Sequence, residues 1–336
     1  MLWHSRVMAV LLMALLAVSC GSATGAARAR RAPRTPVPSP SPSPTPVPTA
    51  VESQLLPWQL SAPLSREAVF AASSPSQLIV AGGLLSSGDS TAQVDIVDTG
   101  SGHQTPAGDL SNPTHDAAAA DVGRQLLVLG GGDAAPSAST ERLVPSGQQA
   151  GTGSLPQPRA DASATAIGAT AYVVGGYDGP ATDAVVLATT DGTGFTQVAT
   201  LPVPVRYPAV AAIAGMIYVF GGETLAGNPV AAIQMVDPAT NQAFVVGNLP
   251  APLSGAIAAA LGGEIVIAGG ESPGPSGLQP VGNVYAYLPG ASGVLAAGSL
   301  QVAVSNAGGA VVGGDLWIVG GETAGGIPSA DVQMVT

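Results

Sequence analysis

Charged side chains recur beside short glycine pairs, and these residues are where the sequence could carry chemistry. Five acids follow the glycine pairs, and five further candidates stand before the apolar runs that lead into them: Asp133, Asp178, Glu223, Glu271, Glu322, and Arg66, Asp116, Arg159, Arg206, Tyr207. A ring of carboxylates can bind a cation or amino groups, and arginines can hold a carboxylate or a sulfate. These ten are the candidate ligand-binding residues. The alternative is that the arginines pair with acids of neighbouring repeats and only fix the loops.

The glycine pairs divide the chain into repeats. Their first glycines are spaced 48, 45, 46, 48 and 51 residues apart and are Gly82, Gly130, Gly175, Gly221, Gly269 and Gly320. Each pair ends a short apolar run, as in Ile217 to Phe220. A period this long and regular marks a repeat architecture. The pairs follow strand-like runs and do not open helices, so they are not phosphate-binding loops.

Each period contains four short runs with the composition of strands. An Ala/Val-rich run, a glycine turn, the run into the glycine pair, a third run and a weak fourth run follow one another. Glycine and proline interrupt every run before it reaches helical length. Six units of four strands predict an all-β, six-bladed β-propeller over residues 54–336. The alanine-rich strands are expected nearest the axis, where only small side chains fit.

The two ends of this region are expected to close the ring. The chain stops after a third strand, Val332 to Val335, and residues 54–60 resemble a fourth strand. We therefore predict that residues 54–60 form the outer strand of the last blade, which removes the open edges of an unclosed array.

The repeats resemble those of the Kelch family. The glycine pairs stand in all six copies, and the motif Leu-Pro-x-Pro occurs at residues 155–158, 201–204 and 249–252. The family's aromatic residues are sparse here, with Tyr285 and Tyr287 in the third strand of one repeat only. The resemblance implies a Kelch-type propeller with lightly packed blades. Some bacterial Kelch propellers are sugar mutarotases, so carbohydrate chemistry using Glu and Arg stays open.

The N-terminal segment predicts export. Residues 1–20 read as a signal peptide, because Arg6 precedes an uncharged run that is too short to span a bilayer. Small residues before Cys20 resemble a bacterial lipobox, so Cys20 is the predicted lipidation site. Residues 21–53 form a Pro/Ser/Thr-rich tether, which proline keeps extended. We expect an extracytoplasmic protein anchored by the lipid, or a secreted protein if cleavage occurs elsewhere.

Composition limits the chemistry further. Residues 54–336 carry five arginines against twenty acids, a net charge of −15, which disfavours nucleic acid as a partner. Cys20 is the only cysteine, so no disulfide within the chain and no cysteine-ligated metal site can form. Only His103 and His115 lie in the repeats, and neither stands near a nucleophile motif. We expect no catalytic residue, no metal and no cofactor.

The expected function is a tethered, monomeric binding module that recognises a protein or glycan through one loop face. The membrane is contacted only through the lipid. Two alternatives remain: a carbohydrate-active enzyme of the mutarotase or epimerase type that uses the same face, and a purely structural component of the envelope.

Overall fold

The protein was analysed as a computed structural model that describes residues 50–336 apart from Arg124. The predicted signal peptide, Cys20 and most of the tether lie outside these residues. Residues 47–336 form one compact unit, which holds every strand that the structure describes. In the described part of the chain every regular element is a strand, and no helix there is long and apolar enough to cross a membrane.

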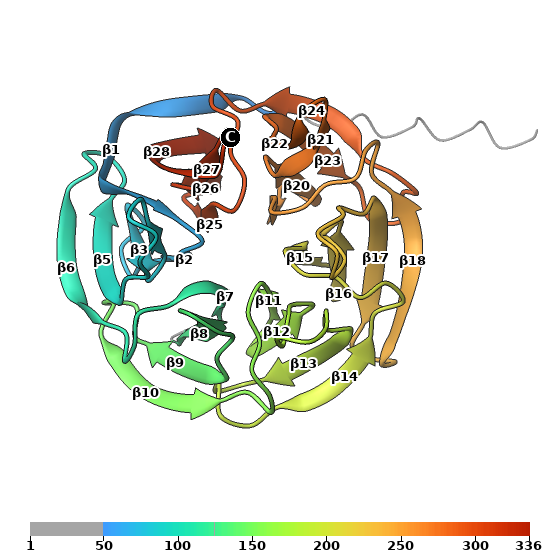
Figure 1. Ribbon diagram of the computed structural model, residues 1–336, viewed down its shortest axis with the longest axis horizontal. Helices are drawn as coiled ribbons and strands as arrows, with labels where there is room; N and C mark the ends of the chain where they lie inside the picture. The colour runs from blue at the N-terminus through green and yellow to red at the C-terminus, as the bar shows by residue number, and fades with distance from the viewer. Residues whose placement is uncertain (1–49, 124) are drawn as a thin grey trace, which may run out of the picture. The chain divides into compact units, whose positions relative to one another are not determined.

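Six antiparallel blades, each with four main strands, are arranged around a common axis (Figure 1). This confirms the predicted all-β, six-bladed propeller. The first three blades comprise β2 (Ala68–Ala71), β3 (Gln77–Ala81), β5 (Gln93–Asp98) and β6 (Gln104–Asp109); β7 (His115–Asp121), β8 (Leu126–Gly132), β9 (Ser139–Leu143) and β10 (Gln149–Ser154); β11 (Ser163–Ile167), β12 (Thr170–Val174), β13 (Val185–Thr189) and β14 (Thr196–Thr200).

The remaining blades follow the same order from the axis outwards. They comprise β15 (Ala209–Ile213), β16 (Met216–Phe220), β17 (Ala232–Asp237) and β18 (Gln242–Asn248); β19 (Ile257–Leu261), β20 (Glu264–Ala268), β23 (Asn283–Tyr287) and β24 (Leu295–Ser299); β25 (Gly308–Val312), β26 (Asp315–Val319), β28 (Ile327–Val335) and β1 (Ser53–Ser65).

The sixth blade takes its outer strand from the start of the described chain. Strand β1 pairs antiparallel with β28, with Ser53 opposite Val335 and Leu55 opposite Gln333. The predicted closure by residues 54–60 is therefore confirmed, and the strand extends beyond them at both ends. Two register shifts bend β1, and its last residues pair with β4 (Leu84–Leu85) of the first blade. One strand thus joins the two ends of the ring.

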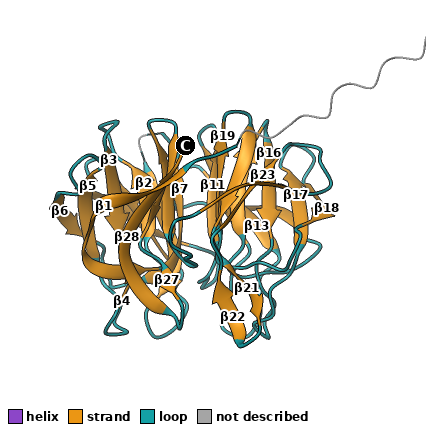
Figure 2. Ribbon diagram, turned by 90° about the horizontal axis from the view of Figure 1, so that it is seen from above, coloured by secondary structure: helices purple, strands orange, loops and turns teal. Residues whose placement is uncertain are grey.

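Loops that follow the glycine pairs add small elements that the sequence did not predict. The fifth blade carries the hairpin of β21 (Glu271–Gly274) and β22 (Gly277–Pro280), and the sixth carries β27 (Glu322–Thr323), which pairs with β28. Together with β4 they project on one face of the ring, the lower edge in Figure 2. We call this face the glycine-pair face.

Apolar side chains pack between neighbouring blades. Val174 and Val186 of the third blade, for example, share a cluster with Val219 and Val236 of the fourth. Most of this core is Val, Ile, Leu and Ala. One aromatic group fills the space between the fourth and fifth blades, where the Tyr287 ring lies 5.0 Å from Tyr218 and 5.2 Å from Phe220.

The innermost strands surround a channel of about 330 Å³. Its wall is mostly alanine, contributed by β2, β7, β11, β15, β19 and β25. Six strands converge there, so larger side chains would collide. The alanine-rich first strands therefore lie nearest the axis, as predicted.

The glycine pairs hold each blade against the next. In all six pairs the second glycine donates its N–H, over 2.8–2.9 Å, to a carbonyl just before the next blade: Thr114, Arg159, Val205, Leu253, Val304 and Leu64. A Cβ on the first glycine would press into that same carbonyl oxygen, as Gly221 would into Leu253. Both glycines also have positive φ. The pairs are thus inter-blade contacts.

Replacing Gly221 by Ala should destabilise the propeller more than replacing Gly227. Both residues have positive φ, 60° and 75°, which costs a non-glycine residue about 1–2 kcal/mol. Only Gly221 is closed in by the Leu253 carbonyl, whereas nothing lies within 4 Å of a Cβ on Gly227. We expect Gly221→Ala to cost about 2 kcal/mol more than Gly227→Ala, measured by urea unfolding. Equal costs would contradict the inter-blade role.

Candidate functional site

A ring of six residues surrounds the channel where it opens on the glycine-pair face. All have positive φ, between 49° and 60°, and each stands at or just before the first strand of its blade: Arg66, Asp116, Asp161, Tyr207, Gly255 and Asn306. We call them the ring residues. The N–H of each donates to the carbonyl of the ring residue before it, and Arg66 donates to Asn306, over 2.7–3.0 Å. The backbone therefore closes the ring without help from side chains.

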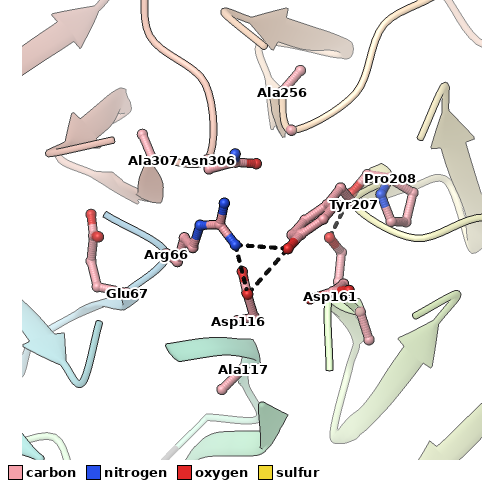
Figure 3. Close-up of a pocket in the computed structure, with 13 residues that line it drawn as sticks. Arg66, Glu67, Asp116, Ala117, Asp161, Tyr207, Pro208, Ala256, Asn306 and Ala307 are labelled. Atoms are coloured by element: carbon pink, nitrogen blue, oxygen red, sulfur yellow. Dashed lines mark hydrogen bonds and ion pairs between the residues drawn. The ribbon is translucent and has the colours of Figure 1, made fainter. Parts of the chain in front are cut away.

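Arg66 is the centre of a side-chain network in this opening, which we call the mouth (Figure 3). Its Nε donates to Glu322 Oε1 over 2.6 Å, and its Nη1 donates to Asp116 Oδ2 over 3.0 Å. The same Nη1 lies 2.9 Å from the Tyr207 hydroxyl, which is itself 3.1 Å from Asp116 Oδ2. Three ring positions, together with the glutamate after the sixth glycine pair, bring these side chains together from the first, second, fourth and sixth blades.

Arg206 makes a second cluster beside the first. Its Nε lies 2.8 Å from Asp161 Oδ2 and 3.4 Å from Glu223 Oε1. Its guanidinium lies between the rings of Tyr177 and Tyr207, at 4.9 and 4.8 Å from their centroids, and donates to the Tyr207 hydroxyl over 3.3 Å. Charge pairing and cation–π contacts together fix its position.

The protonation of the mouth follows from these contacts. Both arginines donate to the Tyr207 oxygen, so its own proton goes to Asp116. Burial and the charges of Asp116 and Asp161 raise the pKa of Tyr207, which keeps the phenol neutral. Burial and the charge of the nearby Asp116 together raise the pKa of Asp161 to about 7, although the charge of Arg206 opposes both. The mouth therefore holds one acid that can be protonated near neutral pH beside Asp116.

The opposite side of the mouth is lined by small side chains. The mouth is a cavity of about 110 Å³, lined by Gly255, Ala256 and Ala307 as well as by Arg66, Asp116 and Tyr207. A recess of about 220 Å³ continues past Arg206 towards His115, Asp133 and Tyr177. The mouth therefore has a charged wall and an open wall, although the fold is built from six similar repeats.

His115 makes a chain of contacts that resembles a catalytic triad. The Ser90 hydroxyl lies 2.8 Å from His115 Nδ1, and His115 Nε2 lies 3.5 Å from Asp116 Oδ2. The single proton of the hydroxyl is donated to Asp133 Oδ1 over 2.7 Å, so His115 Nδ1 must donate to the hydroxyl. A serine that accepts from its histidine is not activated as a nucleophile.

The structure brings most of the candidate residues together. Six share the mouth network: Arg66, Asp116, Arg206, Tyr207, Glu223 and Glu322. Glu271 lies next to them but receives only a 3.5 Å hydrogen bond from Ser254. Asp133 lies at the outer recess.

Two candidates lie apart from the mouth network. Arg159 is 1% exposed, forms an ion pair with Asp183 and donates to the Val185 carbonyl over 2.8 Å, so it fixes the third blade from inside. Asp178 accepts from the Ala181 N–H over 2.7 Å and shapes its own loop.

The alternative from the sequence, in which arginines pair with acids of neighbouring repeats, describes Arg66 with Asp116 and Glu322. It also describes Arg206 with Asp161, whereas Arg159 pairs within its own blade.

Sequence reasoning omitted Asp161 and Asn306 from the candidates. Asn306 Nδ2 donates to Glu322 Oε2 over 3.0 Å, and Asp161 pairs with Arg206. A signal existed, because the ring residue precedes its glycine pair by fourteen positions in five of the six repeats. Aligning the repeats on that offset would have identified both residues.

Glu67 is a buried acid at the contact between the first and sixth blades. Its Oε1 accepts from the Gly308 N–H over 3.0 Å, and it is 5% exposed. The pKa of Glu67 is raised to about 8, mainly by burial. The backbone N–H bonds that Glu67 accepts lower it, and the charge of Glu322 raises it. The folded protein therefore keeps a proton here at neutral pH that the unfolded chain releases.

Glu67 should make the propeller less stable as the pH rises. Between pH 4.5 and 8 the folded state holds more protons than the unfolded state, so the unfolding free energy falls with pH by at most about 1.4 kcal/mol per unit. Glu67→Gln removes this loss, so its advantage over the unmodified protein should grow from pH 5 to 8. Urea unfolding across that range tests it, with the exposed Glu52→Gln as control. Parallel pH dependence of Glu67→Gln and the unmodified protein would contradict it.

Comparison with known proteins supports the fold. No family model matches the sequence, and no curated protein matches it. Among solved structures, one described as "Structure of YjhT" is similar over 82% of this chain and 95% of its own, with a TM-score of 0.68 and 16% sequence identity. At this identity the likeness concerns the fold, and the chain is a six-bladed β-propeller.

Proposed function

We propose that this protein is a binding module that takes a group of a protein or glycan ligand into the mouth on the glycine-pair face. The observation that carries the proposal is the polar network at one end of an otherwise alanine-lined channel. Gly255 occupies a ring position with no side chain, so the ring closes without one. The charged side chains of Arg66, Asp116 and Arg206 are therefore not needed to close the ring, and we assign them to ligand binding.

The proposal includes a place outside the cytoplasm. The uncharged run after Arg6 and the small residues before Cys20 support export and lipidation. The proline-rich tether supports a propeller held away from the membrane. In this arrangement the ligand belongs to the cell envelope or the surroundings.

Removing charges from the mouth should weaken ligand binding. Arg206→Ala leaves Asp161 and Glu223 without their cation, and Glu223→Ala removes one acceptor, so each should weaken binding by about tenfold or more. Full-length protein can be screened on a glycan array and a peptide array. Asp315→Asn, on the opposite face at the start of β26, is the matched control. Unchanged binding in both mouth variants would contradict the site.

A sugar mutarotase or epimerase of the same mouth is the second candidate. The observation in its favour is the pair of acids beside Tyr207: Asp161, with a pKa of about 7, could act as a general acid while Asp116 acts as a base. The propeller fold is compatible with either function.

This second candidate predicts a pH-dependent rate. Single anomers of neutral and acidic sugars should equilibrate faster with the protein than without it, as followed by NMR. The rate should fall as the pH rises through about 7, because Asp161 loses the proton that it donates. Asp161→Asn should lower the catalysed rate by about 100-fold, whereas Asp178→Asn should not. Equilibration at the uncatalysed rate would exclude this function.

A further inference from the structure

The loops on the glycine-pair face divide into two halves of different chemistry. Those of the first and second blades carry the exposed acids Asp89 and Asp133. Those of the fourth, fifth and sixth blades carry exposed apolar residues: Leu225 is 51% exposed, Leu278 39% and Ile327 59%. Apolar residues exposed on the loops of three successive blades can contact a protein partner that spans these loops.

Each apolar residue belongs to the same loop as a glutamate of the mouth. Leu225 follows Glu223 by two residues, and Ile327 pairs with Thr323, next to Glu322. Strands β21 and β22 place Leu278 opposite Pro273, two residues after Glu271 (Figure 2). A partner seated on the apolar residues therefore also faces the carboxylates.

The three glutamates are not equally neutralised. Glu322 is paired with Arg66 at 2.6 Å and Glu223 with Arg206 at 3.4 Å. Within the described part of the chain, Glu271 forms no ion pair. The next ring residue after its loop is Asn306, whose amide donates to Glu322 instead, and the ring residue of its own blade is Gly255. Burial and the charges of Glu223 and Glu322 raise the pKa of Glu271, while the Ser254 hydroxyl and the charge of Arg66 oppose this.

We infer that the partner is a protein segment that inserts a lysine or arginine side chain at Glu271 and packs apolar neighbours on Leu225, Leu278 and Ile327. Glu271 forms a backbone bridge with Ser254, and the next two residues, Gly255 and Ala256, are the small residues at that side of the mouth. The net charge of −15 over residues 54–336 attracts a basic partner and repels an acidic one. Exposed leucine and isoleucine favour a protein over a glycan. This inference rests on the proposed binding function and specifies its partner.

A peptide library tests the inference directly. Random 12-residue peptides displayed on phage are selected on the full-length protein, and the winners are measured as synthetic peptides by fluorescence anisotropy. We expect winners to carry Lys or Arg between apolar residues, and norleucine in place of that Lys or Arg to weaken binding about tenfold or more. Affinity should also fall as salt rises, because the contact at Glu271 is electrostatic.

Matched variants separate the two parts of the surface. Glu271→Gln should weaken the winning peptides about tenfold, whereas Asp315→Asn should not. Leu278→Ser combined with Ile327→Ser should weaken them about fivefold. Phe244→Ser combined with Leu295→Ser, exposed residues on the outer strands β18 and β24, is the control for apolar loss.

The outcomes distinguish this inference from the proposed function. Acidic or uncharged winners, a library with no winner, or binding unaffected by Glu271→Gln would each overturn the cationic partner. Ligands that still depend on Arg206 and Glu223 would then leave the binding function standing. If no ligand depends on those two residues, the proposed function fails as well.

Discussion

The contact between each glycine pair and the next blade is the constraint on which the rest of the structure depends. At Gly221 and Gly222, one glycine leaves space for the Leu253 carbonyl and the other donates a hydrogen bond to it. Two residues after that carbonyl the chain reaches a ring residue, Gly255, whose positive φ turns its N–H towards the Tyr207 carbonyl. This arrangement occurs once in each of the six blades, so it joins every pair of neighbouring blades and also closes the inner ring. The backbone alone thus fixes where the mouth lies.

Because backbone hydrogen bonds close the ring, the side chains at the ring positions can differ from blade to blade. The same position holds an arginine, two aspartates, a tyrosine, a glycine and an asparagine. Ion pairs that are partly withdrawn from water, such as Arg66 with Glu322, add little net stability, since desolvation offsets their attraction. Their stronger effect is to hold charged groups in one arrangement. A symmetric fold can in this way present an asymmetric site.

The sequence was sufficient to predict the propeller, because both the spacing of the glycine pairs and the closing strand follow from one repeated unit. It was less informative about where arginines point. Arg66 is a ring residue, Arg206 stands one position before a ring residue, and Arg159 stands two positions before one. Arg66 and Arg206 both lie at the mouth although their offsets differ, whereas Arg159, one position further from the turn, is buried inside its blade. The direction of an arginine side chain depends on how far the residue stands from the turn with positive φ, and this distance cannot be counted until the turn has been located.

In three blades a glutamate directly follows the glycine pair, and it takes part both in the backbone contact and in the mouth. Glu223, Glu271 and Glu322 each form a backbone bridge with the residue that precedes a ring residue, so their main chains belong to the structural contact. Their side chains are not used by that contact and point towards the mouth network. Arginines form ion pairs with Glu322 and Glu223. Glu271, beside small residues, forms no ion pair within the described part of the chain. The same backbone that positions the acids therefore creates both the neutralised and the unsatisfied sites, and the difference between them lies in whether an arginine stands at a neighbouring ring position, as Arg66 does, or directly before one, as Arg206 does.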